Sequence, residues 1–228
     1  MMLKPNNWPA LGILTMVAAA TAALSIFIKV TEEVVEGDTG KIDLLIIMWL
    51  RTAGNPIDPL GPRWFEDYAR DITALGSPPV LGLFVLICVI FLLLSDKRRL
   101  SIYMLITAGC GTLVVTALKE IYDRPRPQLM PDHVFVYAAS FPSAHAMVSA
   151  VVYLTLGTLI ARLTPNTLLK LYIMSVAVIL TGMIGLSRIY LGVHWPSDVL
   201  AGWAVGAAWV LGGEALAQIM KLDEENTK

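Results

Sequence analysis

The chain has 228 residues, of which 56% are hydrophobic and only 15% are charged. This composition is too apolar for a soluble domain of this length, and it predicts an integral membrane protein. The formal net charge of −1 gives no sign of a strongly basic surface, so no nucleic-acid partner is expected.

Six apolar runs approach the length of about 20 residues that crosses a bilayer. They are residues 8–30, 79–95, 100–118, 144–160, 168–186 and 199–216. The pattern predicts an all-α fold, a six-transmembrane-helix bundle that forms a single membrane domain over residues 1–228. Small residues at 18–23 resemble a signal-peptide cleavage site, but the apolar run continues through Ile28, which favours an uncleaved first span. Cys88 and Cys110 fall inside predicted spans and suggest neither a disulfide nor a metal site.

The first connection, residues 31–78, is expected to contain short interfacial helices. It opens with an acidic segment over 32–43, and the apolar run at 44–50 is too short to span. Apolar side chains then recur at helical spacing, with charged residues on the other side: Trp64, Phe65, Tyr68, Ala69 and Ile72. This pattern fits a helix in the membrane interface or, equally, a helix packed on the end of the bundle. Residues 76–79, Gly-Ser-Pro-Pro, end that helix and begin the second span.

A tight loop at residues 95–99 carries the densest basic cluster, Lys97, Arg98 and Arg99. Short loops rich in Lys and Arg face the cytoplasm, so this loop is predicted to be inside. Segments 31–78, 119–143 and 187–198 then lie outside. The predicted location is a bacterial cytoplasmic (inner) membrane, with these segments on the periplasmic side.

The connection at 187–198 places Arg188, His194 and Asp198 between two spans, where ionisable groups are costly and often functional. Pro196 suits the first position of a helix, so Asp198 falls in its first turn, four residues after His194. A carboxylate there can fix the imidazole tautomer and leave the other nitrogen free to attack. Alternatively, Asp198 only caps the helix and His194 is an interfacial polar residue.

The segment 142–145 again has a proline where a helix begins, followed by Ser143, Ala144 and His145. A helix N-terminus offers unpaired N–H groups and a positive dipole end, which together bind phosphate-like anions. Ordinary capping by Ser143 is the alternative interpretation.

The span count puts residues 119–127, 142–145 and 187–198 on one face of the membrane. Three cations, Lys119, Arg126 and Arg188, suit a phosphate dianion. Two imidazoles allow an in-line displacement, in which His194, with its local carboxylate, attacks and His145 protonates the leaving oxygen. No carboxylate cluster suited to Mg²⁺ accompanies them, so the prediction is that no metal ion or cofactor takes part.

These three stretches, Lys119-x6-Arg126-Pro127, Pro142-Ser143-Ala144-His145 and Ser187-Arg188-x5-His194-x3-Asp198, resemble the signature motifs of the type 2 phosphatidic acid phosphatases. The resemblance implies metal-independent dephosphorylation of lipid phosphates through a phosphohistidine. It implies that the phosphate is surrounded by Lys119, Arg126, Ser143, His145 and Arg188, with His194 as nucleophile and Asp198 as its partner.

Ala144 stands where the family usually has Gly; its amide can still bind phosphate, but its methyl group narrows the pocket. Arg124 is expected either to support the site from behind the phosphate-binding residues or to contact the head group, and His133 is expected to be a surface residue.

The predicted function is hydrolysis of a membrane lipid phosphate or diphosphate. The substrate classes implied by the resemblance are undecaprenyl diphosphate, phosphatidylglycerophosphate and phosphatidate. The alternatives are a lipid phosphotransferase, a lipid A phosphatase, or a non-catalytic lipid-binding membrane protein.

Overall fold

The computed structural model describes residues 8–127, 129 and 139–220. Within them the chain forms helices and one short hairpin. The elements are α1 (Trp8–Glu36), α2 (Gly40–Trp49), β1 (Arg51–Thr52), β2 (Asn55–Pro59), α3 (Arg63–Ala74), α4 (Pro78–Leu94), α5 (Arg98–Tyr122), α6 (Ala144–Arg162), α7 (Thr167–Tyr190) and α8 (Pro196–Ile219). The prediction of an all-α membrane protein is confirmed.

Five of these helices, α1 and α5 to α8, are each long and apolar enough to cross a membrane. Helix α4 has 17 residues and follows α3 at a bend of 44°. The described part of the chain has six candidate spans only when α3 and α4 are counted together as one span. The predicted second span therefore exists as a helix, but the number of crossings depends on this bent pair.

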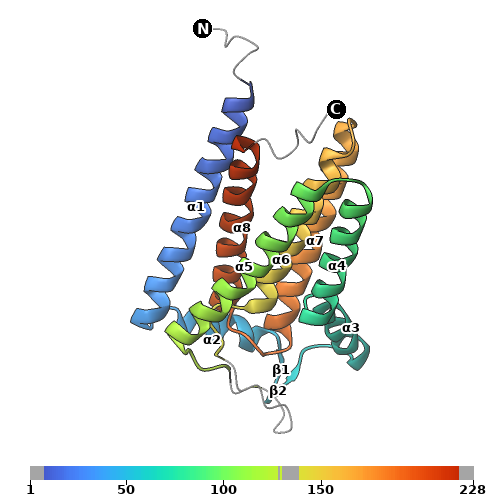
Figure 1. The fold of residues 1–228 in the computed structure, drawn as a ribbon. Helices are drawn as coiled ribbons and strands as arrows, with labels where there is room; N and C mark the ends of the chain where they lie inside the picture. The colour runs from blue at the N-terminus through green and yellow to red at the C-terminus, as the bar shows by residue number, and fades with distance from the viewer. Residues whose placement is uncertain (1–7, 128, 130–138, 221–228) are drawn as a thin grey trace.

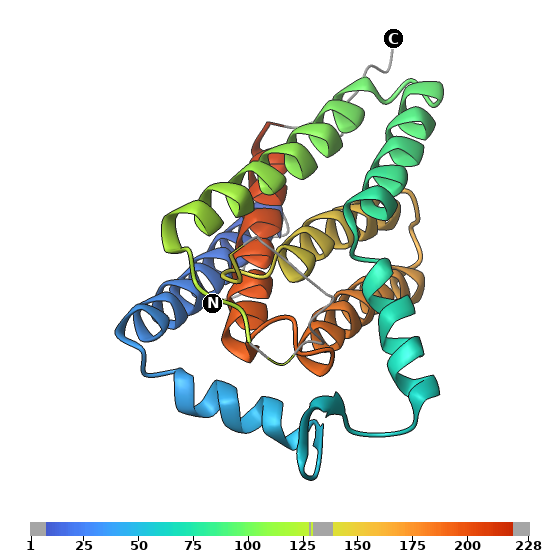
Figure 2. The same ribbon diagram turned by 90° about the horizontal axis from the view of Figure 1, so that it is seen from below.

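Helix α6 lies at the centre of the bundle, in contact with α4, α5, α7 and α8, and α1 lies along α8 (Figures 1 and 2). Two glycines on α8 allow α6 to approach closely. A Cβ at Gly202 would lie 2.7 Å from the carbonyl oxygen of Ser143, and one at Gly206 would lie 2.9 Å from Cβ of Ala150. Small residues at such crossings are the usual way for membrane helices to pack.

The first connection differs from the sequence prediction in detail. Helix α1 runs through Glu36, beyond the predicted end, because nothing interrupts it before Gly37, whose φ is +86°. The antiparallel pair β1–β2 turns at Gly54, with φ +82°, and was not predicted because its strands are too short to show a period. Helix α3 packs on the end of the bundle against α7, where Phe65 meets Tyr190 edge-on, while Trp64 stays 67% exposed.

One end of the bundle gathers the polar segments. The end of α5, the start of α6 and the junction of α7 with α8 lie at the same end as α2, the hairpin and α3 (Figure 1). The start of α1 and the end of α8 lie at the other end. This is the single face that the alternation of the helices predicts.

Candidate active site

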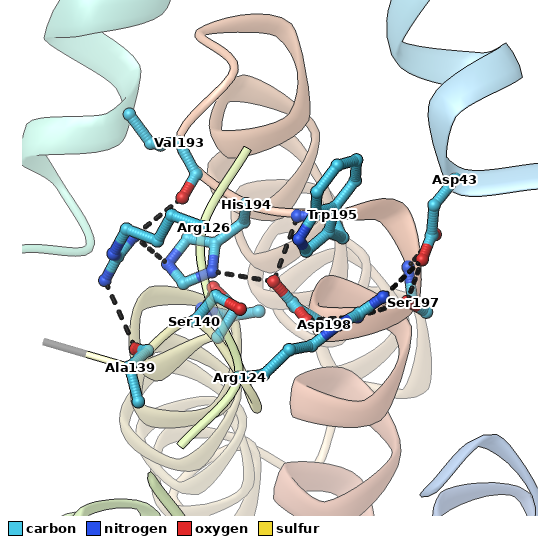
Figure 3. A network of polar contacts seen from close by, with 12 residues as sticks. Asp43, Arg124, Arg126, Ala139, Ser140, Val193, His194, Trp195, Ser197 and Asp198 are labelled. Carbon is cyan, nitrogen blue, oxygen red and sulfur yellow. Dashed lines mark hydrogen bonds and ion pairs between the residues drawn. The ribbon is translucent and has the colours of Figure 1, made fainter. Parts of the chain in front are cut away.

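His194 lies in the short segment between α7 and α8 and is almost fully buried, at 1% exposure. Its Nδ1 lies 3.3 Å from Oδ2 of Asp198, the third residue of α8 (Figure 3). The same oxygen accepts the N–H of Trp195 at 3.0 Å. Asp198 therefore caps the helix and contacts the imidazole at once, so the two interpretations of this carboxylate hold together.

The other ring nitrogen of His194 faces Arg126. Nη1 of Arg126 lies 3.1 Å from Nε2 of His194 and donates to the carbonyl oxygen of Val193 at 2.6 Å. Because a guanidinium only donates, Nε2 is the acceptor and Nδ1 carries the proton toward Asp198.

The surroundings of His194 favour its neutral form. Burial, and then the positive charges of Arg126, Arg188 and Lys119, lower the pKa of His194 well below 6.5. Burial likewise lowers the pKa of Arg126, although the charge of Asp198 opposes the shift. The site thus holds a neutral imidazole whose Nε2 lone pair accepts a hydrogen bond from the Arg126 guanidinium.

Two more cations come from the last turns of α5 and α7. The ammonium of Lys119 donates to the carbonyl oxygen of Ala139. Nη1 of Arg188 donates to the hydroxyl of Thr73 on α3 at 3.0 Å, and its buried Nε has no partner among the described residues. A guanidinium with a free buried donor suits an oxyanion.

A backbone hydrogen bond joins the N-terminus of α6 to the first turn of α8. Ser143 is the N-cap of α6, its hydroxyl accepts the N–H of Ala146 at 3.5 Å, and its own N–H donates to the carbonyl oxygen of Asp198 at 2.9 Å. Ala144 and His145 follow in the first turn. The charged and titratable groups around His145 are Arg188, His194, Arg126 and Lys119. The structure therefore brings together all eight residues that the sequence predicts for the site.

Arg124 takes a different direction from Arg126. Its Nη1 donates to Oδ1 of Asp198 at 2.6 Å, and its Nη2 donates to Oδ2 of Asp43 at 2.9 Å (Figure 3). Arg124 thus lies behind Asp198, which favours a supporting role over a head-group contact.

Three neighbours of the site were missed from the sequence. Asp43 is buried, at 2% exposure, and is the last carboxylate of the acidic segment 32–43, directly before an apolar run, which is a signal that could have found it. The absence of a side chain at Gly76 leaves space for His145 and Ile184. A Cβ there would lie 3.2 Å from Cδ2 of His145 and 2.5 Å from Cγ2 of Ile184. Thr73 carries no sequence signal. His133 lies outside the described residues.

A cavity of about 470 Å³ leads from between α4, α5 and α6 to His145 and Lys119. Its walls are mainly apolar or small, including Leu81, Gly82, Val85, Leu105, Ala108, Gly109, Val115, Val148 and Val152. A space of this size and character fits a hydrocarbon chain whose polar end reaches His145 and Lys119.

Comparison with known proteins gives one family and several relatives. A family model described as the PAP2 superfamily matches residues 98–218. Phosphatidylglycerophosphatase B of Bacillus subtilis is 31% identical over 144 residues, which cover 63% of this chain and 70% of that protein. Decaprenylphosphoryl-5-phosphoribose phosphatase of Mycobacterium tuberculosis is 31% identical over 146 residues, covering 61% and 73%.

The fold is also similar to a solved structure. The crystal structure of a transmembrane PAP2 type phosphatidylglycerolphosphate phosphatase from Bacillus subtilis aligns with a TM-score of 0.79 at 23% identity. The alignment covers 92% of this chain and 98% of that one, and it supports the arrangement of the helices.

Proposed function

This chain belongs to the PAP2 superfamily, and we propose that it is a metal-independent membrane lipid phosphatase that works through a phosphohistidine. The relatives named above are phosphatases whose names specify lipid-linked phosphates. A third relative, an undecaprenyl-diphosphatase of Sulfolobus acidocaldarius, is 25% identical over 126 residues, which cover 53% of this chain and 56% of that protein. The shared substrate chemistry is a phosphate or diphosphate attached to a lipid.

The arrangement of His194 between Asp198 and Arg126 is the observation that carries this proposal. Asp198 lies at Nδ1, and Arg126 lies at Nε2, the nitrogen with the lone pair. A nucleophilic imidazole needs an oriented lone pair, and Asp198 orients the ring. The phosphate needs a cation that holds its oxygens close to the attacking nitrogen, and Arg126 lies there.

In the first step, Arg126 exchanges its hydrogen bond to His194 Nε2 for one to a phosphate oxygen. The lone pair released on Nε2 attacks phosphorus while the bond from phosphorus to the lipid oxygen breaks in line. His145 gives its proton to the departing oxygen, so the lipid leaves as a neutral alcohol when the substrate is a monoester. Negative charge on the phosphoryl oxygens is balanced by Lys119, Arg126 and Arg188. These cations stabilise the transition state in the way that a metal ion does elsewhere.

In the second step, water attacks the phosphohistidine and gives a proton to His145, which is now a base. The N–P bond breaks, inorganic phosphate leaves, and both histidines return to their starting forms. In this mechanism the N–H groups at the start of α6, at Ala144 and His145, serve as additional donors to the phosphate.

The substrate lies with its phosphate at the outer end of the bundle and its chain in the cavity between α4, α5 and α6. In this arrangement the site faces the periplasmic side of the inner membrane, and the basic loop at 95–99 faces the cytoplasm. Labelling with a membrane-impermeant maleimide in intact cells tests the orientation, with Cys88 and Cys110 first replaced by Ala. Asn55→Cys, in the exposed hairpin, should react, and Arg98→Cys should not; the reverse result would invert the topology.

The enzymatic test is phosphate release by purified, detergent-solubilised protein in the presence of EDTA. The panel is phosphatidate, phosphatidylglycerophosphate and a polyprenyl diphosphate. Release should occur with at least one lipid, and a base-stable, acid-labile phosphoenzyme should be trapped in the wild type. His194→Ala should abolish both signals while the protein stays folded, and His133→Ala is the matched control.

Release that persists in His194→Ala would overturn the histidine mechanism. If the phosphoenzyme forms but its phosphoryl group passes only to a second lipid alcohol, giving a phosphorylated acceptor and no free phosphate, the protein is a phosphotransferase instead. Absence of phosphoenzyme and product with every lipid would favour a non-catalytic relative.

A further inference from the structure

Asp43 on α2 forms hydrogen bonds with Ser197 in the first turn of α8, although the two residues are 154 positions apart in the sequence. The N–H of Ser197 donates to Oδ1 of Asp43 at 2.9 Å, and the Ser197 hydroxyl donates to Oδ2 at 2.5 Å. The N–H groups of a first helical turn have no partner within the helix. Asp43 therefore supplies, from another helix, an acceptor of the kind that a local cap residue usually provides.

The same carboxylate also holds Arg124. The Arg124 guanidinium bridges Oδ2 of Asp43, at 2.9 Å, and Oδ1 of Asp198, at 2.6 Å. The Asp43 and Asp198 side chains are 3% and 0% exposed, so the ion pairs are shielded from water. Arg124 also lies over the ring of Trp195, 5.5 Å from its centroid. It is fixed on several sides at once.

This bridge decides how Asp198 faces His194. Arg124 takes one carboxylate oxygen of Asp198, and the other oxygen meets Nδ1 of His194 and the N–H of Trp195. A carboxylate held at both oxygens cannot rotate, so the imidazole it contacts keeps one tautomer and one orientation. We propose that Asp43 and Arg124 are positioning residues, which act through Asp198 to hold the nucleophile His194. This inference rests on the proposed function.

Arg124 also balances the charge of Asp198 as it acts on His194. Without that cation, the full negative charge of Asp198 favours the protonated imidazole, which cannot attack. The ionisable groups that face His194 from the surrounding helices and loops are Asp198, Arg126, Arg188, Lys119 and His145. Because these are unchanged in Arg124 variants, a shift in the pH profile isolates the contribution of Arg124.

The test compares Arg124→Gln, Asp43→Asn and the double variant, using the lipid that the wild type hydrolyses best. In Arg124→Gln, kcat should fall about 10- to 150-fold, the range for losing one charge-assisted hydrogen bond. KM and the inhibition constant of inorganic phosphate should stay within about 2-fold, because the phosphate-binding cations are untouched. The acidic limb of kcat/KM should move to higher pH.

The double variant tests whether an unpaired buried charge at Asp43, and not the loss of Arg124 itself, causes the effect. It removes Arg124 and Asp43 together, so Asp43 does not remain as an unpaired buried carboxylate, while Asp198 loses Arg124 as it does in the single variant. An amide pair can still form a hydrogen bond. Its kcat should be no lower than that of Arg124→Gln by more than about 2-fold, because Asp43 acts through Arg124. The matched controls are Arg70→Gln and Glu66→Gln, which remove charges from a pair whose arginine is 62% exposed, and these should retain wild-type kinetics.

Wild-type kcat and an unmoved acidic limb in folded Arg124→Gln and double variants would overturn the inference. A loss confined to KM and phosphate affinity would also overturn it, since Arg124 would then bind substrate directly. His194→Ala separates this result from the proposed function: if it is inactive while the Arg124 variants are normal, only the positioning role fails. If His194→Ala is active, the histidine mechanism itself fails.

Discussion

Nη1 of Arg126 lies 3.1 Å from Nε2 of His194, the ring nitrogen opposite the one that meets Asp198. In the proposed mechanism, a phosphate oxygen bound by this guanidinium brings its phosphorus to the lone pair of Nε2. The same Nη1 donates to the carbonyl of Val193, the residue before the proposed nucleophile His194. The position of the phosphate is therefore coupled to the position of His194.

Replacing Arg126 should weaken catalysis through the loss of this contact. We expect Arg126→Ala to lower kcat/KM about 10- to 150-fold, corresponding to roughly 1.5–3 kcal/mol for a charge-assisted hydrogen bond. Arg126→Lys should recover only part of the loss, because it keeps the charge without the planar fork. Steady-state phosphate release checks this, and Arg70→Ala, at a 62% exposed side chain, is the control. Similar losses in both alanine variants would contradict the role of Arg126.

The lowered pKa of His194 predicts a pH dependence of stability. Below about pH 6.5 an unfolded histidine takes up a proton, whereas folded His194 stays neutral until a lower pH, so the unfolded state binds more protons. The contribution of His194 to the free energy of unfolding is therefore full at neutral pH and decreases as the pH falls. The decrease is up to about 1 kcal/mol between pH 6.5 and 5.5. Thermal unfolding in detergent at these pH values should show a smaller acid loss in His194→Gln than in the wild type. Equal losses would mean that His194 is already protonated in the fold.

The cavity between α4, α5 and α6 should distinguish long-chain from short-chain substrates. Gly82 lines this cavity, and a Cβ at this position would have nothing within 4 Å, so Gly82→Leu places a side chain in the path of the lipid chain. We expect kcat/KM for a long-chain lipid phosphate to fall at least about 10-fold, which corresponds to roughly 1.4 kcal/mol. A short, water-soluble phosphate ester should be hydrolysed at the wild-type rate. Gly182→Leu on α7, equally unobstructed but away from the cavity, is the control. Parallel losses with both substrates would argue against a chain-binding cavity.

The close contact between α6 and α8 should be sensitive to a single methyl group. In Gly202→Ala the new Cβ would lie 2.7 Å from the carbonyl oxygen of Ser143 and 3.0 Å from Cβ of Ala146. The start of α6 must then shift, at a cost of about 1–3 kcal/mol in stability, and activity should fall because the start of α6 is part of the site. Gly212→Ala, on the same helix with nothing within 4 Å, should be neutral or stabilising by up to about 1 kcal/mol. Thermal unfolding and phosphate release compare the two variants, and an equal response would rule out the packing argument.

The membrane class, the helix starts near the site and the end of the bundle that holds the candidate site all follow from the sequence. Prolines at 142 and 196 and the Gly-Ser-Pro-Pro segment at 76–79 set helix starts locally, because they act on their own backbone. Once the helices alternate in direction, the face of each motif follows from counting. Asp198 could be placed near His194 for the same reason, since four residues make one helical turn.

The motif spacing points to Arg126 for the phosphate, but only the tertiary structure shows that Arg124 binds Asp198 and Asp43. Arg124 and Arg126 both precede a proline and look alike in sequence, yet one turns to Asp43 and Asp198 and the other to His194. Asp43 and Thr73 come from the first connection, and their partners lie more than a hundred residues away. Local patterns fix the backbone of each helix, but the partner of a buried charge depends on which distant helix packs beside it.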